Sequence, residues 1–166
     1  NVYVILQVRL HEEIQKLKER IENEETDEKH EIELTYITPR GKWYFVSWKG
    51  DMEKSGGVAT NIGIHFFDML MWIFGPVQKN ESHHSEPKKM SGYLELEKAR
   101  VKWYLSVDKE DLSKIGKEQK PFRSITVDGE EIEFSGGFTD LHTKTYENII
   151  DGKGFGIDDA YPSIEL

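Results

Sequence analysis

Apolar and polar residues follow two different periods along the chain. They alternate through 31–38, which is typical of a strand with one buried face. Apolar residues recur at helical spacing in 11–23 and in 58–74, and Gly75-Pro76 ends the second of these helices. By the same criteria we predict strands over 2–10, 42–48, 92–96, 99–107, 122–127 and 130–134, and a last helix over 139–150.

The remaining segments are predicted to be loops, namely 23–30, 50–57, 79–91, 108–120 and the tail 152–166. The chain therefore runs strand, helix, strands, helix and then a meander of strands, in which Asp128-Gly129 marks a hairpin turn. This order favours an α+β fold, with an open-faced, mostly antiparallel sheet that helices cover on one face. The length of 166 residues suits a single domain.

The composition argues against several classes of function. With 22 Lys and Arg against 31 Asp and Glu, the net charge is −9, which disfavours a nucleic-acid or anionic membrane partner. No apolar run approaches the ~20 residues of a membrane span. The absence of cysteine excludes disulfides and a cysteine nucleophile, and it is compatible with a reducing cytoplasm. His83 and His84 lie in a polar segment without a second pair of ligands, so we predict no metal site.

The helix predicted over 58–74 has two different faces. At ~100° per residue, Asn61, His65, Asp68 and Trp72 form one stripe, and the apolar residues form another. The helix contains no Lys or Arg and only one acid, so the first stripe does not simply face water. A histidine with its ordinary pKa of ~6.5 suits proton transfer. A packed histidine whose ring is held by Asp68 fits the same spacing, and both interpretations stay open.

Two further groups of residues carry candidate chemistry. Arg9 and His11 occupy alternate positions at the end of the first predicted strand, so they share a face. The segment 40–44 joins Arg40 to a lysine and two aromatic residues, which suits an anionic, ring-bearing ligand such as a nucleotide sugar. A surface pair and an ordinary hairpin turn explain the two groups equally well.

The glycines of 152–156 do not form a dinucleotide-binding fingerprint. They follow a helix, and the ribose-binding acid expected ~20 residues further on would lie beyond Leu166. The sequence contains no phosphate-binding P-loop either. We therefore expect no nucleotide-binding βαβ unit within this chain.

The segment 56–68, with the sequence GGVATNIGIHFFD, resembles a motif of the Gfo/Idh/MocA oxidoreductases. The motif lies in their C-terminal domain and reads roughly G-G-x-x-x-D-x-G-x-H-x-x-D. The segments 7–11, 40–44, 48–50, 138–143 and 154–160 are similar to one branch of the family. This branch contains the UDP-N-acetylglucosamine and UDP-N-acetylglucosaminuronate 3-dehydrogenases, which act in lipopolysaccharide sugar synthesis. The similarity runs from Arg9 nearly to Leu166.

The resemblance implies a domain that works with a second one. Family members have an N-terminal Rossmann domain that binds NAD(P), and a C-terminal domain of the dihydrodipicolinate-reductase-like type with a large open-faced sheet. The C-terminal domain supplies substrate contacts and the sheet used for oligomers. The E-K-P lysine of the family belongs to the Rossmann part, and no such motif occurs here. We therefore expect residues 1–166 to be one C-terminal substrate-binding and oligomerisation domain of a longer protein.

The resemblance also implies the roles of individual residues. His65 matches the family histidine near the reacting sugar hydroxyl and is the expected catalytic residue. Asn61 stands where many members carry Asp, so it is a hydrogen-bonding group rather than a base. The expected substrate contacts are Asn61, Arg9, His11, Arg40, Tyr44 and His142.

The expected reaction is NAD- or NADP-dependent oxidation of a sugar hydroxyl, at C3 of a UDP-N-acetylhexosamine or its uronate. The cofactor is expected in the intact protein and not on this chain alone, which would then be inactive. The expected partners are the nucleotide sugar and further copies of the chain, in a cytoplasmic dimer or tetramer. The alternative is a stand-alone, non-catalytic binding or dimerisation module.

Overall fold

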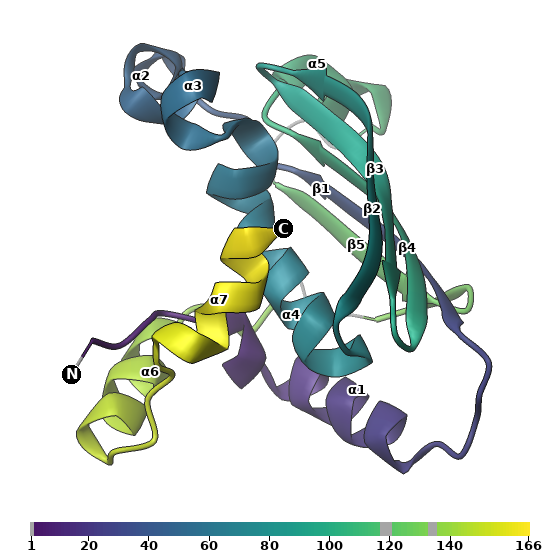
Figure 1. The fold of residues 1–166 in the computed structure, drawn as a ribbon. Helices are drawn as coiled ribbons and strands as arrows, with labels where there is room; N and C mark the ends of the chain where they lie inside the picture. The colour runs from purple at the N-terminus through teal and green to yellow at the C-terminus, as the bar shows by residue number, and fades with distance from the viewer. Residues whose placement is uncertain (1, 117–120, 133–135) are drawn as a thin grey trace.

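The computed structural model describes residues 2–116, 121–132 and 136–166, which build a six-stranded sheet with helices on one face (Figure 1). The order of the strands is β2-β3-β4-β1-β5-β6. Their bounds are β1 His30–Ile37, β2 Val77–Glu86, β3 Lys89–Leu96, β4 Ala99–Ser106, β5 Phe122–Val127 and β6 Glu130–Glu131. Only β1 and β4 pair in parallel, and all other neighbours are antiparallel. The α+β fold and the mostly antiparallel sheet are thus confirmed.

Seven α-helices and three turns of 3₁₀- or π-helix are present in the described residues. The helices are α1 Glu12–Asn23, α2 Lys42–Val46, α3 Met52–Ser55, α4 Ile64–Phe74, α5 Lys109–Lys114, α6 Leu141–Ile150 and α7 Ile157–Glu165. The turns are two 3₁₀ helices, η1 Gln7–Leu10 and η2 Trp48–Gly50, and the π-helix η3 Ala59–Gly63. Helix α4 lies along the inner face of the sheet and contacts α1 and α7 (Figure 1).

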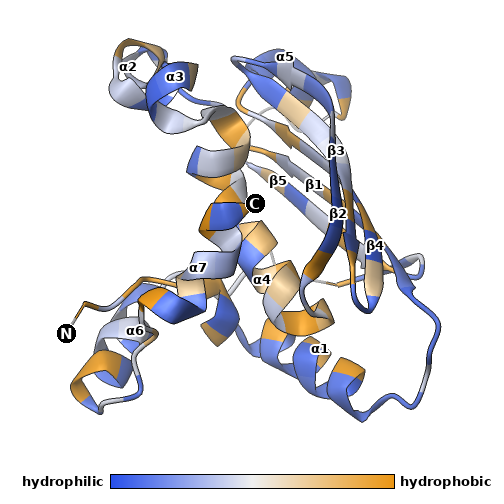
Figure 2. Cartoon of the chain, viewed as in Figure 1, coloured by the Kyte–Doolittle hydropathy of each residue, from blue (hydrophilic) through white to orange (hydrophobic). Residues whose placement is uncertain are grey.

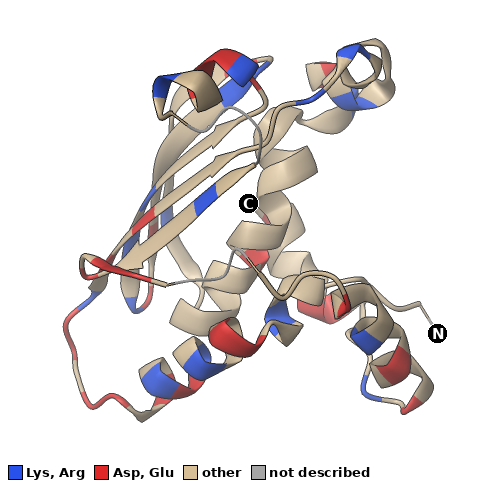
Figure 3. Ribbon diagram, turned by 180° about the vertical axis from the view of Figure 1, so that it is seen from behind, with Lys and Arg blue, Asp and Glu red and all other residues tan. Residues whose placement is uncertain are grey.

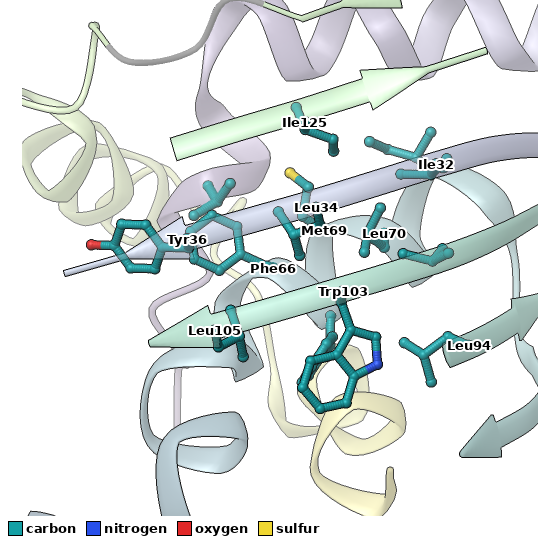
Figure 4. Close-up of a cluster of buried hydrophobic side chains, with 14 of the residues drawn as sticks. Ile32, Leu34, Tyr36, Phe66, Met69, Leu70, Leu94, Trp103, Leu105 and Ile125 are labelled. Atoms are coloured by element: carbon teal, nitrogen blue, oxygen red, sulfur yellow. The ribbon is translucent and has the colours of Figure 1, made fainter. Parts of the chain in front are cut away.

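The core lies between α4 and the inner face of the sheet. Figure 4 shows the rings of Tyr36 from β1 and Phe66 from α4 side by side, with their centroids 4.9 Å apart. Met69 and Leu70 from α4 and Leu34 from β1 continue this layer, and all three are almost fully buried. Helix α1 adds an apolar stripe on one side and keeps polar residues on the other (Figure 2). Residues at every second position of the strands and at helical spacing in the helices are buried here. This explains why the two periods could be recognised in the sequence.

The strand predicted over 2–10 is wrong. The described part of this segment has no strand, and it ends in the 3₁₀ helix η1. It runs beside the segment before α7, where the amide of Val4 donates to the carbonyl of Phe155 at 2.9 Å. Leu6 and Val8 are buried by helices rather than by strand neighbours. The β-branched apolar run therefore indicated correctly that the segment is buried. It indicated incorrectly that the segment is a strand.

The strand predicted over 42–48 is also wrong, because the segment forms α2 and then η2. Its aromatic residues favour strands in general, but only Tyr44 is buried, while Trp43, Val46 and Trp48 are more than half exposed. The α2–η2–α3 segment stands away from the sheet at the upper left of Figure 1. Without a sheet beside it, the segment closes its hydrogen bonds locally.

Four predicted loops contain regular structure. The polar segment 79–91 pairs β2 with β3, and its polarity reflects an edge strand whose residues are almost all solvent-exposed. Residues 50–57, 108–120 and 152–166 contain the short helices α3, α5 and α7. The end of the strand predicted over 130–134 and part of 108–120 lie outside the described residues.

The helical segment Met52–Phe74 is long and apolar enough, by composition alone, to cross a membrane. Two thirds of its most apolar stretch are buried inside the domain. Its apolar surface is thus used by the sheet and by α1, as in a core helix.

A buried ion pair joins three separate elements. The guanidinium of Arg9 in η1 donates to the carboxylate of Asp68 in α4 through Nε at 2.8 Å and Nη2 at 2.6 Å. Nη2 also donates to the carbonyl of Asp159 in α7 at 2.9 Å, and the rings of Trp72 and Phe155 flank the guanidinium. Arg9 is only 7% exposed and Asp68 only 3%. The pair therefore fixes how α4 is rotated against η1 and α7.

We expect Asp68→Leu and Arg9→Leu each to lower the free energy of unfolding by about 3–5 kcal/mol, because each leaves one buried charge unpaired. The double variant should lose clearly less than the sum, since it leaves no lone charge. Urea unfolding of the four proteins measures these differences. Strictly additive losses would show that the two groups do not act as a pair.

Candidate functional site

The helix that carries the candidate histidine begins with a π-helical turn. The helix predicted over 58–74 is present, but η3 precedes α4, so its first turn is wider than the α-helical wheel assumed. At Gly63 in η3 a side-chain carbon would lie 2.5 Å from Leu105 of β4, so a glycine is needed for this close approach to the sheet. Asn61 in η3 and His65 at the start of α4 nonetheless line the same cavity. π-Helical turns are frequent at functional sites.

This cavity, called the histidine cavity below, has a volume of about 210 Å³. Its walls come from η1, β1, the loop after β1, η3, α4, β5 and the segment before α6. The lining residues are Gln7, Val8, Tyr36, Arg40, Asn61, Ile62, His65, Phe66, Arg123 and Phe138. The apolar members form its walls, and the polar members supply two cations, two amides and one imidazole.

His65 is half-buried, and neither of its ring nitrogens has a hydrogen-bond partner among the described residues. Burial lowers its pKa below the ordinary 6.5; the carboxylate of Asp68 opposes this shift and His142 adds to it. At neutral pH the ring is therefore a neutral base with free nitrogens. The interpretation in which Asp68 holds this ring is wrong, because both carboxylate oxygens of Asp68 bind Arg9.

Asn61 is held in place from behind. Its Nδ2 donates to the hydroxyl of Tyr44 at 3.1 Å and to the carbonyl of Lys49 at 3.4 Å. This leaves the side-chain oxygen of Asn61 without a partner in the described part of the chain, so it can accept a hydrogen bond in the histidine cavity. Tyr44 is only 2% exposed and does not line the cavity. Its place is therefore that of a support for Asn61.

Two arginines give the histidine cavity its charge. Arg40 is exposed, whereas Arg123 is half-buried with its guanidinium over the rings of Phe138 and Tyr36, at 4.2 and 5.2 Å. Neither forms an ion pair with a described residue. An acidic chain thus presents two unpaired guanidiniums beside a neutral imidazole, an arrangement suited to an anionic ligand.

The sequence analysis missed Arg123 and Gln7. Arg123 lies in phase with Ile125 and Val127, which are buried, so a cation on the inner face of the predicted strand was a visible signal. Gln7 has a buried side-chain oxygen without a hydrogen-bond partner among the described residues. It could not be found in advance, because its segment was predicted as a strand.

Besides Tyr44, three further expected substrate contacts do not line the histidine cavity. Arg9 is occupied by Asp68. His11 caps α1, where its Nδ1 accepts from the amide of Glu13 at 3.3 Å, so its Nε2 carries the proton and donates to the carbonyl of Gly136 at 2.8 Å. We leave both out of the site that we propose. His142 is exposed on α6 and does not line the cavity, although it acts electrostatically on His65.

The described residues include no group of three His, Asp or Glu that could hold a metal ion. Nor do they form a strand, glycine-rich loop and helix that could bind a dinucleotide. The histidine cavity offers a ligand one imidazole, two amides and two cations.

We expect His65 to titrate below pH 6.5 in an NMR titration of its ring protons, because burial disfavours the charged ring. The unfolded chain then binds more protons than the folded one as the pH falls through 6.5, so stability falls with it. His65→Gln should reduce this acid sensitivity. His83→Gln, on an exposed strand, is the matched control. A titration midpoint at or above 6.5 would contradict the electrostatic description.

Comparisons with known proteins agree with this fold. Residues 18–112 match the family described as "Oxidoreductase family, C-terminal alpha/beta domain" of the Gfo/Idh/MocA type. The WlbA (WbpB) dehydrogenase from Thermus thermophilus was crystallised with NAD and UDP-GlcNAcA. That structure is 50% identical over 99% of this chain and 53% of its own, with a TM-score of 0.90. The same dehydrogenase with NAD and alpha-ketoglutarate matches 98% of this chain and 53% of its own at 53% identity, with a TM-score of 0.88.

A more distant relative shares the fold. The WlbA dehydrogenase from Bordetella pertussis, solved with NADH and UDP-GlcNAcA, is 18% identical over 98% of this chain and 57% of its own, with a TM-score of 0.72. The chain spans about half the length of these relatives. The family match covers more than half of the chain, and the chain belongs to the Gfo/Idh/MocA oxidoreductases as a C-terminal α/β domain.

Proposed function

We propose that this chain is the substrate-binding and assembly domain of an NAD-dependent dehydrogenase that oxidises the C3 hydroxyl of a UDP-N-acetylhexosamine or its uronate. The observation that best supports this proposal concerns His65. Its imidazole is half-buried and has no hydrogen-bond partner in the described residues, and it lies in a cavity with two unpaired arginines. The Thermus thermophilus relative with UDP-GlcNAcA and NAD supports the choice of substrate and cofactor. A cytoplasmic location is part of this proposal.

Oxidation of a secondary alcohol removes a proton from the oxygen and a hydride from the carbon. His65 takes the hydroxyl proton on a free ring nitrogen, and its lowered pKa favours later release of that proton to solvent. Asn61 accepts a hydrogen bond from the sugar and orients it. The hydride acceptor would be the oxidised nicotinamide of NAD, which a part of the enzyme outside this chain would hold.

The size of the histidine cavity indicates which part of the substrate it binds. Its 210 Å³ is below the roughly 300–1,000 Å³ of ordinary ligand pockets, so it accommodates the sugar ring and not a whole nucleotide sugar. The nucleotide part of the substrate would extend out of the cavity past Arg40, towards α2 and η2. There Trp43 and Trp48 expose their rings, and the ammonium of Lys49 lies 5.9 Å from the ring of Trp48. Aromatic faces next to cations suit a base and its phosphates.

The proposal includes assembly through the outer face of the sheet. Charges of both signs lie on neighbouring strands of this face (Figure 3), with the acidic Glu31 and Glu33 on β1 opposite the basic Arg100 and Lys102 on β4. Such a face is self-complementary when two copies meet about a two-fold axis. We propose a dimer or tetramer built on this face.

A second candidate is a binding or dimerisation module that does not catalyse. The observation that favours it is the lack of a dinucleotide-binding unit in the described part of a chain that matches half the length of its relatives. Both candidates share the sugar site and the sheet face. They differ in whether the assembled protein oxidises the sugar.

We expect the chain to bind UDP-GlcNAcA in calorimetry, and to turn it over only as a chimera with the part of the Thermus thermophilus dehydrogenase that it does not cover. His65→Asn should lower the kcat of the chimera by about 10²–10⁴-fold, the usual contribution of a general base, and leave binding nearly unchanged. His83→Asn, a remote and exposed histidine, should change neither.

Three results would contradict parts of this proposal. No binding of the nucleotide sugar would contradict the substrate. Turnover that His65→Asn leaves intact would remove the role of His65. Turnover by the chain alone with NAD would disprove its dependence on a second domain.

We expect light scattering to give the mass of a dimer or tetramer. Lys102→Glu places a third acid beside Glu31 and Glu33 on the outer face, so it should shift the distribution towards the monomer. Lys153→Glu, an exposed lysine between α6 and α7, makes the same change of charge away from the sheet and should have no effect. A wild-type chain that stays monomeric would contradict the assembly role.

A further inference from the structure

Arg123 is an unusual cation in this chain. The sequence contains five arginines, and three of them, Arg9, Arg20 and Arg100, meet a carboxylate. Arg40 is exposed and needs no partner, whereas Arg123 is half-buried and has none in the described part of the chain. A half-buried cation without a counter-charge loses part of its hydration and gains no ion pair in return. Its position therefore calls for an explanation.

The surroundings of Arg123 hold the guanidinium without neutralising it. It lies on β5 opposite Tyr36 of β1, and the rings of Tyr36 and Phe138 contact its faces. Contacts of this kind fix the plane of the guanidinium and leave its N–H donors, which lie in that plane, unused. An anion in the histidine cavity would supply the missing acceptors.

In the same cavity, Gln7 is an acceptor that lacks a hydrogen-bond donor. Its side-chain oxygen is buried and accepts no hydrogen bond from any described residue. A lone buried acceptor is unfavourable until a donor reaches it. A ligand that satisfies both residues carries an anionic group and a hydroxyl or amide N–H close together, as an acidic sugar does.

We propose that Arg123 binds the carboxylate of an acidic sugar and makes the site prefer uronates to neutral sugars. This inference rests on the proposed function. The cavity has room for the sugar ring, so the anion that meets Arg123 is the one on the ring. The diphosphate lies outside with the exposed Arg40. A planar guanidinium binds a carboxylate through two parallel hydrogen bonds.

The test is calorimetry of the chain with three probes, namely UDP-GlcNAcA, UDP-GlcNAc and UDP. We expect the wild-type chain to bind the acid more tightly than the neutral sugar. Arg123→Gln should weaken binding of the acid by about tenfold or more and leave the other two affinities nearly unchanged. Arg123→Lys keeps the charge but not the paired donors, so it should retain part of the preference. Arg40→Gln should weaken all three probes together.

The possible failures are distinguishable. An equal loss for all three probes in Arg123→Gln would place this guanidinium at the diphosphate and overturn the inference. Equal wild-type affinities for the acid and the neutral sugar would overturn it and leave the proposed function standing. No binding of either sugar would contradict the proposed function itself. Circular dichroism checks that the variants fold, and Arg123→Lys alone decides the question if Arg123→Gln does not.

Discussion

The buried pair of Arg9 and Asp68 is the interaction on which the geometry of the domain depends. It connects η1, α4 and α7, three elements that are far apart in the sequence. Because Asp68 lies one turn after His65, fixing its direction also fixes the direction of the imidazole. The energetic cost of burying the pair is offset by its bidentate geometry and by the carbonyl of Asp159. A structural ion pair thus places a catalytic candidate without touching it.

The polar stripe on the long helix serves two purposes as a result. Its C-terminal half, Asp68 and Trp72, packs around Arg9, whereas its N-terminal half, Asn61 and His65, opens into the histidine cavity. Periodicity alone could not separate these halves, because both present polar groups at the same spacing. What separates them is the partner that each half meets in the fold.

Much of the fold could be predicted from the sequence, and the reasons for the failures are physical. Helix α1 and strands β1, β4 and β5 have one buried face each, and burial imposes the period that was used. Strand β2 has no buried face, so its residues look like those of a loop. The segment 2–10 is buried by helices, and its β-branched residues misled the choice of structure. The predicted site residues His65, Asn61 and Arg40 line one cavity, and their roles stay a prediction. Arg123 was not singled out, although its phase with the buried Ile125 and Val127 placed it on the inner face of a predicted strand.

The groups that matter for a ligand are those that the fold leaves unsatisfied. In a folded domain nearly every buried polar group finds a partner, and Arg9, His11 and Asp68 follow this rule. Around the histidine cavity the side-chain oxygen of Gln7 breaks it, and the half-buried His65 and Arg123 also lack a partner among the described residues. Three polar groups of one small cavity are thus left open to a ligand. A bound anionic sugar would satisfy these groups, because its hydroxyls and its carboxylate supply the hydrogen-bond partners that the described residues do not.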